Sequence, residues 1–565
     1  MDLPNPADSS NSNPNTATPN VARSDSPFAT FALIWAVSSL LHQLAFTFWA
    51  ESWMGWIFVF SAIAVLFRPD CLFRFGALIA TSLLNLWNKL PFVPNHILFE
   101  GMLHVIMLLG LVAVLRLRGG TILTGLGAGS KRDWLFLLIV VVLKAVYHLT
   151  PAIPKGYLLG AISTALLLFA IGRVLFRSPS VGGGEDWYAR FAPVVRWAIP
   201  IVYIWALIQK LNIDYLNPEV SCAAKLHNEI AIYFGGLIPT ATWAQHVAIW
   251  GSFALELIIP ICLFVPRLRY LGFCGAVGFH LWLAIHPAAG IFSFSTLILA
   301  ILALFLATPW RKELHRLWQG QLAWLGRGNV ARGRKLARWI VVIGFFACLI
   351  SQGALYLIIE RSFEVFQTAN RIGFVAFMIW GVWLGACYLI SGWRTRRAED
   401  TRITPAIATL AWIGLLPVLA NGVWPWIGGR TQTSFSMYSN LRSEGEGNHL
   451  FLKRVDWLKS QSDFVEILSS EPDILIPTNR PRGIQQFANP GLNVLPWFEF
   501  RRLVSEQPDD FAVSYQRDGE QKSLGRRGGE IYGDEAAFEP LPLLARKFVW
   551  FRRLESLDGP MPCTH

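Results

Sequence analysis

A lysine that follows a long apolar run is the residue of this chain best placed to do chemistry. In IVYIWALIQKLNIDYLNP, Lys210 ends the apolar stretch, and Asn212 and Asp214 lie directly beyond it. Such a lysine either extends its amine to lipid headgroups, or it is partly desolvated, which favours the neutral amine that acts as a base. The carboxylate of Asp214 would oppose the second effect, so the sequence leaves both interpretations open.

Two later apolar runs carry further ionisable groups. Glu256 lies deep in WGSFALELIIPICLF, where a carboxyl group must be either protonated or paired. His280 lies inside GFHLWLAIH, and His286 ends that run. Ionisable groups in apolar segments are candidates for function by default. The structural alternative for His280 is a histidine bonded to a backbone carbonyl.

An earlier run places ionisable groups at every fourth position. In PNHILFEGMLH, His96, Glu100 and His104 would share one face of a helix. That spacing fits a metal site or a polar stripe that faces the inside of a bundle. We favour the stripe, because the set has one carboxylate only, and we predict no metal. Lys144 and His148 repeat the same spacing in the next run.

The elements that would hold these groups belong in a membrane. The 565 residues are 53% hydrophobic and 15% charged, whereas a soluble domain has about 25% charged residues. A spanning helix needs about 20 apolar residues. We predict an all-α membrane bundle of eleven to thirteen transmembrane helices, because one segment is short and two are closely linked. The candidate segments are 28–50, 54–67, 73–90, 97–117, 134–150, 156–176, 193–210, 243–265, 270–286, 290–309, 337–358, 372–392 and 405–427.

Basic residues set the expected orientation of these segments. Lys and Arg gather in the loops that follow the even-numbered segments, and cytoplasmic loops collect such residues. We therefore expect a cytoplasmic N-terminus, with residues 1–27, rich in Pro, Asn and Ser, as a disordered tail. The most basic loop, 311–338, is interpreted as a contact with lipid headgroups of the bilayer. We predict no nucleic-acid partner, although the net charge is +12.

The last quarter of the chain differs in composition. Residues 428–565 are slightly acidic and contain the β-like runs HLFLKRV, FAVSY and FVWFRRL, separated by turn signals. We predict a small, mostly β domain outside the membrane, on the periplasmic side of an inner membrane if the protein is bacterial. Residues 28–427 would form the transmembrane domain. Cys222 and Cys563 both fall outside, so they are either a disulfide or two distant thiols.

Three pieces of sequence resemble one known family. YIWALIQKLNIDYL is similar to an apolar helix that ends in Lys-Leu-Asp/Asn, and LELIIPICLF carries an embedded acid. GFHLWLAIHPAAGIFSFSTLILA is similar to a Phe-His pair followed by Gly-x-Phe-Ser. Residues 199–309 thus resemble the transmembrane domain of vitamin K-dependent gamma-carboxylase and its bacterial relatives, the HTTM (horizontally transferred transmembrane) proteins. The similarity is looser over the rest of the predicted membrane region.

The resemblance implies a chemistry. In the carboxylase, the matching lysine deprotonates reduced vitamin K, oxygen adds, and the strong base that results removes a glutamate γ-proton. Carbon dioxide captures the carbanion, and the quinone leaves as its epoxide. Such chemistry requires a water-poor site, and its co-substrates here would be a reduced quinone of the vitamin K or menaquinone type, O2 and CO2. The implied site residues are Lys210 and His280 as catalytic groups and Asn212, Asp214, Glu256 and His286 as substrate-binding groups.

The sequence also departs from the family. The carboxylase has an Asn-His-Tyr sequence upstream of the lysine helix, and two alignments place its histidine near Val114 or Arg173, where this chain has none. Two additional helices are expected between the fourth and seventh segments. The carboxylase's large outer region, which binds the propeptide and glutamates, has no obvious counterpart.

Three functions therefore stay open. The first is an enzyme that uses a quinol, with Lys210 as the base. The second is a quinone- or lipid-binding scaffold without catalysis, whose outer domain meets an envelope or peptide partner. The third is a transporter with a proton path through Lys144, Glu256 and His280. It ranks last, because no inverted repeat is visible.

Overall fold

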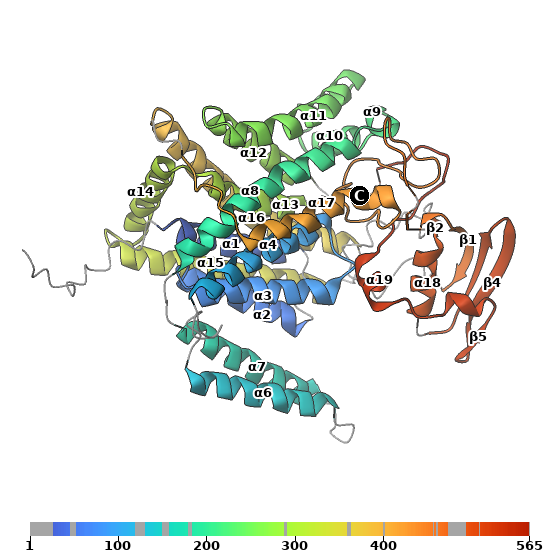
Figure 1. The fold of residues 1–565 in the computed structure, drawn as a ribbon, viewed down its shortest axis with the longest axis horizontal. Coiled ribbons are helices and arrows are strands. Elements are labelled where there is room, and N and C mark those ends of the chain that lie inside the picture. Colours follow the sequence, from blue (N-terminus) through green and yellow to red (C-terminus); the bar gives the residue numbers. More distant parts are fainter. Residues whose placement is uncertain are drawn as a thin grey trace, which may run out of the picture.

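Helices dominate the structure, and a small antiparallel sheet follows them near the C-terminus (Figure 1). This arrangement confirms the predicted fold class of a mostly helical bundle with a small sheet. The structure is a computed structural model. It describes residues 26–45, 52–118, 130–149, 157–178, 183–286, 291–358, 363–398, 402–455, 457–458, 461–472, 493–507 and 509–563.

Every predicted apolar segment corresponds to a helix or to a broken helix. A helix bonds all of its backbone groups internally, which an apolar environment requires. The last segment is the broken one, because short 3-10 turns flank its α-helix. The corresponding elements are α1 (Pro27–Gln43), α2 (Trp53–Phe67), α3 (Leu72–Lys89), α4 (Asn95–Arg118), α6 (Lys131–Leu149), α7 (Tyr157–Arg177), α8 (Gly184–Gln209), α11 (Thr242–Phe264), α12 (Arg269–Ala284), α13 (Ile291–Leu302), α15 (Val330–Ile358), α16 (Phe363–Thr395) and α17 (Leu415–Val423).

The described residues contain fewer full spans than predicted segments. Six helices are long and apolar enough to cross a membrane, or seven if α13 and the helix after it form one bent span. The prediction of eleven to thirteen counted shorter elements, such as α1 and α12, which this criterion does not admit. The outer faces of α11 and α15 expose large apolar side chains, among them Val247 and Ile343, each 63% exposed. Such surfaces face lipid, and the chain is an integral membrane protein.

The basic segment 311–338 is helical rather than a loop. Most of it belongs to α14 (Thr308–Leu325), which bends 120° away from the preceding helix, and to the start of α15. Trp310, Leu314 and Trp318 bury one face of α14, whereas Lys312 and Arg316 are exposed. An amphipathic helix of this kind is typical of a membrane surface. The contact with lipid headgroups stays a prediction.

Aromatic packing holds the first helices together. Trp187 of α8 donates from its indole to the carbonyl of Met107 on α4 at 2.7 Å. Its ring lies 5.6 Å from Phe28 and 5.3 Å from Phe75, so that α1, α3, α4 and α8 share one aromatic core. Aromatic pairs contribute about 0.5–1.5 kcal/mol beyond their buried area. This core fixes the helices that carry the candidate site.

The two additional helices expected between the fourth and seventh segments are present. They are α6 and α7, which form a hairpin at the side of the bundle and contact α2 and α3 (Figure 1). Asp133 on α6 accepts from Arg173 on α7 at 2.9 Å. The side chains of Lys144 and His148 lie outside the described residues.

The C-terminal sheet has five antiparallel strands in the order β2-β1-β3-β4-β5. FAVSY forms most of β3 (Phe511–Arg517), as predicted. Asp518-Gly519, both at positive φ, turns that strand into β4 (Glu520–Arg527), as the turn signal indicated. Amphipathic α18 (Trp497–Ser505) packs against the sheet and buries Phe500 and Val504. The remaining strands are β1 (Phe464–Glu471), β2 (Val494–Pro496) and β5 (Glu530–Tyr532).

The other two β-like runs are not strands. HLFLKRV and FVWFRRL each contain a single isolated bridge, at His449 and at Leu554. Leu554 bonds to Val494 of β2 in its bridge, but other backbone bonds of the two runs lie outside the sheet. Leu450 donates to the carbonyl of Leu211 at 2.9 Å, and the carbonyl of Trp550 accepts from Thr431 at 3.3 Å. The chain from 428 to 455 therefore runs along the bundle and does not belong to the sheet.

Candidate functional site

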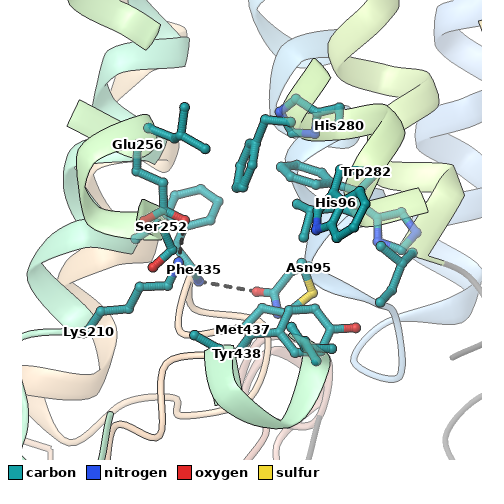
Figure 2. Close-up of a pocket in the computed structure, with 18 of the residues that line it drawn as sticks. Asn95, His96, Lys210, Ser252, Glu256, His280, Trp282, Phe435, Met437 and Tyr438 are labelled. Atoms are coloured by element: carbon teal, nitrogen blue, oxygen red, sulfur yellow. Dashed lines mark hydrogen bonds and ion pairs between the residues drawn. The ribbon is translucent and has the colours of Figure 1, made fainter. Parts of the chain in front are cut away.

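A cavity of about 510 Å³ lies among α4, α8, α11, α12 and α13. Small-molecule sites commonly enclose about 300–1,000 Å³. Its lining is mainly apolar and aromatic, with a few polar groups from different helices. Three of the six predicted site residues, Lys210, Glu256 and His280, line this cavity (Figure 2).

Lys210 and Glu256 form a buried ion pair on one side of the cavity. Lys210 caps the C-terminal end of α8, and its amine donates to a carboxylate oxygen of Glu256 on α11. The two residues are 6% and 7% exposed, and Glu256 Oε2 has no hydrogen-bond partner. The Tyr215 ring lies 5.5 Å from the amine. Lys210 therefore does not extend to headgroups, and the unsatisfied carboxylate oxygen is a free acceptor at the cavity.

His280 lies on the other side of the cavity. Its Nε2 is 2.7 Å from the hydroxyl of Tyr203 on α8, and its Nδ1 is buried without a hydrogen-bond partner. Phe279 and Phe294 each place a ring 5.3 Å from the imidazole. His280 is therefore bonded to a hydroxyl group at the cavity and not to a backbone carbonyl, which was the structural alternative.

The start of α4 contributes two polar residues that the sequence analysis did not assign to the site. His96 is 4% exposed, lines the cavity and bonds through Nε2 to the Ser293 hydroxyl at 2.6 Å. Asn95, its neighbour, accepts from the backbone N–H of Phe435 at 3.1 Å. The Asn-His pair in PNHILFEGMLH was the available signal. The predicted apolar segment began at residue 97, which left His96 just outside it.

The segment after the last membrane helix closes another side of the cavity. Phe435, Met437 and Tyr438 all line it, together with Trp550 from the C-terminal region (Figure 2). Three non-glycine residues here, Thr433, Phe435 and Tyr438, have φ between 55° and 62°. A backbone in this region costs free energy and persists only where surrounding contacts impose it. No hydrophobic period marks these residues, so periodicity alone did not assign them to the site.

Asn212 and Asp214 do not line the cavity. Asn212 caps the short helix α9 (Ile213–Leu216), and its amide donates to the carbonyl of Ser439. One Asp214 oxygen accepts from Asn448 at 2.6 Å and from the Met561 backbone at 2.9 Å. These predicted substrate-binding residues instead attach the C-terminal region to the end of the lysine helix.

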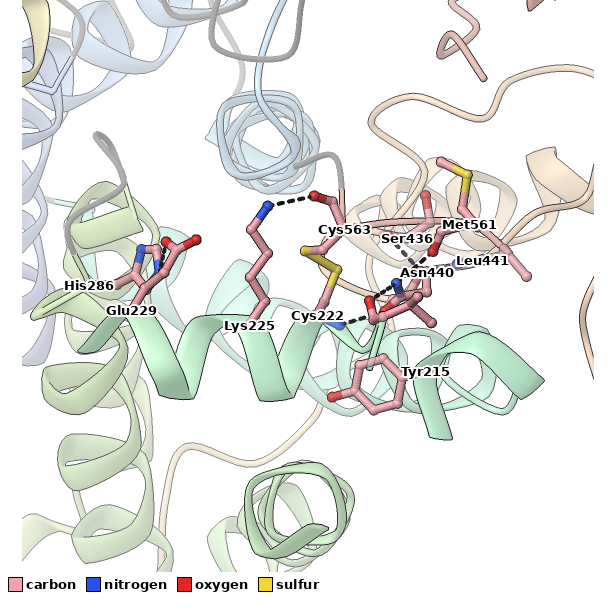
Figure 3. Close-up of a disulfide and its surroundings, with 12 residues drawn as sticks. Tyr215, Cys222, Lys225, Glu229, His286, Ser436, Asn440, Leu441, Met561 and Cys563 are labelled. Atoms are coloured by element: carbon pink, nitrogen blue, oxygen red, sulfur yellow. Dashed lines mark hydrogen bonds and ion pairs between the residues drawn. A yellow bond between two sulfur atoms is a disulfide. The ribbon is translucent and has the colours of Figure 1, made fainter. Parts of the chain in front are cut away.

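His286 also lies apart from the cavity lining. Its Nε2 pairs with Glu229 of α10 (Cys222–Tyr233) at 2.9 Å, and this contact lowers the pKa of Glu229. One turn before Glu229, Lys225 donates to the carbonyl of Cys563 (Figure 3). His286 thus holds α10, which forms one wall of the cavity, although His286 itself does not line the cavity.

A disulfide joins Cys222, at the start of α10, to Cys563, so the first of the two options holds (Figure 3). Asn440 lies beside it and bonds both sides: its Oδ1 accepts from the Cys222 backbone, and its Nδ2 donates to the carbonyls of Val220 and Met561. The disulfide and Asn440 together anchor the chain end and the 431–440 segment next to the cavity.

The cavity therefore combines an apolar interior, a lysine–carboxylate pair and two histidines on another wall. Such a site can bind a lipophilic ring and accept protons from its hydroxyl groups. Trp243 and Val247 line the cavity yet are 62% and 63% exposed, so the cavity reaches the lipid-facing surface of α11. Within the described residues, no group of three or more His, Cys, Asp or Glu is placed to hold a metal ion.

Comparison with curated proteins and with solved structures finds no match to this chain. The model of one family, the HTTM domain, matches residues 189–310. This segment includes Lys210, Glu256 and His280, and the match supports placing it in the HTTM family.

Proposed function

We propose that this membrane protein binds a reduced quinone in the cavity and deprotonates it with Lys210, as the first step of an oxygen-dependent reaction. The observation that carries the proposal is the meeting of Lys210, Glu256 and His280 at one apolar cavity. These three residues come from separate helices, and each is buried.

Lys210 and Glu256 share one proton, which sets what the pair can do. In a medium of low dielectric constant, two neutral partners compete with the ion pair, because desolvation of both charges is costly. The neutral amine is the form that removes a hydroxyl proton. The ammonium formed in that step would then lie beside the quinolate oxygen and stabilise its charge.

The other residues of the cavity would hold the ring. Phe294, Phe435 and Trp282 supply aromatic faces, and Tyr203 fixes the orientation of His280 through its hydroxyl group. The exposed ends of the cavity at Trp243 and Val247 would admit a molecule with a long apolar tail from the bilayer. Oxygen supplies the oxidising equivalents, and the water-poor cavity limits side reactions.

The test is turnover of reduced menaquinone or reduced vitamin K by the purified protein in lipid nanodiscs with oxygen. We expect the quinone epoxide as product, and we expect Lys210→Ala to abolish it. Added carbon dioxide and a glutamate-containing peptide would show whether carboxylation is coupled to it. Tight quinone binding without turnover of any quinol would refute the enzyme and favour the scaffold with an envelope partner. The Lys210–Glu256 ion pair favours that second candidate, since it can hold the amine protonated.

A further inference from the structure

A row of buried ionisable residues leads from the cavity into the bundle. His96, Glu100 and His104 follow one face of α4, as their spacing predicted, and His42 of α1 completes the row. All four are at most 5% exposed. Over the eight residues from His96 to His104, the helix rises about 12 Å. Only His96 lines the cavity.

His42 and Glu100 form the centre of the row. His42 Nδ1 lies 3.0 Å from Glu100 Oε2, and His42 Nε2 is buried without a hydrogen-bond partner. The imidazole rings of His42 and His96 are 5.0 Å apart. A proton taken up at His96 would therefore meet a carboxylate-supported histidine directly behind it.

At its far end, the row of ionisable residues stops at His104. His104 Nε2 accepts a hydrogen bond from the Trp35 indole at 3.0 Å, so this nitrogen carries no proton. The aromatic core around Trp35 lies beyond. The charged and titratable groups that face the His42–Glu100 pair among the described residues are His96, His104 and Lys89 of α3. The row thus opens toward the cavity and ends inside the bundle.

The oxidation of a hydroquinone releases two hydroxyl protons, and this row could accept one of them. A hydroquinone and O2 give the quinone epoxide and one water molecule, so both hydroxyl hydrogens leave the ring. These hydroxyl groups lie at opposite ends of the ring. Lys210 with Glu256 occupies one side of the cavity, and His96 with His280 occupies another (Figure 2). A single base cannot reach both ends of one bound ring.

We propose that His96, supported by the His42–Glu100 pair, is a second proton acceptor of the cavity and takes the proton of the second hydroxyl group. This inference rests on the proposed function. The O–H bond breaks as the second ring carbonyl forms, the electron pair stays on the ring oxygen, and O2 is the oxidant. His96 is the residue that touches the substrate, while His42 and Glu100 are positioning residues. The Ser293 hydroxyl can accept from or donate to Nε2 and so fits both protonation states of His96.

The experiment compares wild type, His96→Gln, His42→Gln and Glu100→Gln in nanodiscs that contain reduced menaquinone. Absorbance without oxygen measures the quinolate formed at Lys210, and epoxide formation after oxygen is added measures the whole reaction across pH. We expect quinolate to form in all four proteins. We expect the epoxide rate of His96→Gln to fall about 10²-fold, the typical contribution of a general base. His246→Gln, the same change at an exposed position of α11 outside the cavity, is the matched control.

The two positioning variants have their own readout. Without the carboxylate of Glu100, an imidazolium in the row is less stable, so the acidic limb of the rate profile moves to lower pH while the maximal rate falls. His42→Gln keeps that carboxylate, so it is expected to lower the maximal rate without moving the acidic limb to lower pH. His96 is the residue of the row that lines the cavity, so His96→Gln tests the inference even where the changes at His42 and Glu100 prevent folding. Wild-type epoxide formation that His96→Gln leaves unchanged at every pH refutes the inference alone. Absence of both quinolate and epoxide in wild type refutes the proposed function instead.

Discussion

Separating Lys210 from Glu256 should destabilise the protein in a way that depends on pH. The changes are Lys210→Met, Glu256→Leu and both together. Each single change leaves one ionisable group in a site where the residues are 6% and 7% exposed. Removing one partner of a buried pair typically costs about 3–5 kcal/mol, whereas replacing both with apolar residues is often neutral.

The free-energy cost of each single change has an upper bound, because the remaining group can become neutral by gaining or losing a proton. A lone Glu256 can be protonated, which at pH 7 costs about 3.7 kcal/mol from a reference pKa of about 4.3. A lone Lys210 can lose its proton, which costs about 4.6 kcal/mol from a reference value of about 10.4. At pH 5 the first cost falls to about 1 kcal/mol, and at pH 9 the second falls to about 2 kcal/mol. Lys210→Met should therefore be mildest in acid, and Glu256→Leu mildest in base.

Thermal unfolding of the purified variants at pH 5, 7 and 9, followed by tryptophan fluorescence, measures these costs. The double variant should recover most of the loss at pH 7, which gives a coupling free energy of several kcal/mol. Arg394→Met is the control, because its pair with Glu313 leaves the arginine 54% exposed and should cost below about 1 kcal/mol. Small, pH-independent losses in both single variants would show that water reaches the pair and that the burial argument is incorrect.

Three further changes test other contacts. Cys222→Ser should cost about 2–5 kcal/mol, because its disulfide closes a loop of 341 residues, and hydrogen exchange at 432–438 should rise. Burial raises the pKa of Glu444, but the guanidinium of Arg552 outweighs it and holds that pKa below its usual value. The pair should therefore stabilise the protein above about pH 4.3 and lose that effect as pH falls through the lowered pKa. Urea titrations of Glu444→Gln should show a lower free energy of unfolding at pH 7 and a weaker dependence of that free energy on pH in acid. Glu229→Gln, whose side chain is 35% exposed in its pair with His286, should shift the unfolding free energy by below about 1 kcal/mol, and a larger loss in the same titration would contradict the assigned exposure.

The helices were predictable because one property decides them. Apolar runs of about 20 residues form helices wherever backbone groups have no water to bond, and all thirteen segments do so. The number of spans was less predictable. Helices α12 and α13, for example, have 16 and 12 residues, so each is shorter than a full span.

Three of the six predicted site residues line one cavity, for a physical reason. Lys210, Glu256 and His280 are ionisable groups inside apolar runs, where each must find a partner. Asn212 and Asp214 follow the lysine closely in sequence, but α8 ends at Gln209 and the chain turns. Their side chains consequently face the C-terminal region. Sequence distance alone does not report that change of direction.

The two runs misread as strands show what a single sequence leaves out. HLFLKRV and FVWFRRL have the composition of strands, yet most of their backbone partners are loops and helix ends elsewhere in the chain. Leu450 donates to the carbonyl of Leu211 at the end of the lysine helix, and the carbonyl of Trp550 accepts from the backbone N–H of Thr431. Extended backbone needs a partner, but it does not need a sheet.

The cavity extends well beyond the segment that matches the HTTM domain. Residues 189–310 supply Lys210, Glu256 and His280. His96 comes from an earlier helix, and Phe435 with its neighbours comes from a segment that follows the last span. The matched part thus contains Lys210, the proposed base, while the unmatched parts contain the opposite wall of the cavity and the segment that closes it. On the proposed function, Lys210 would act from the segment that matches the HTTM domain, whereas the fit of the ring and the fate of its second proton would depend on residues outside that segment.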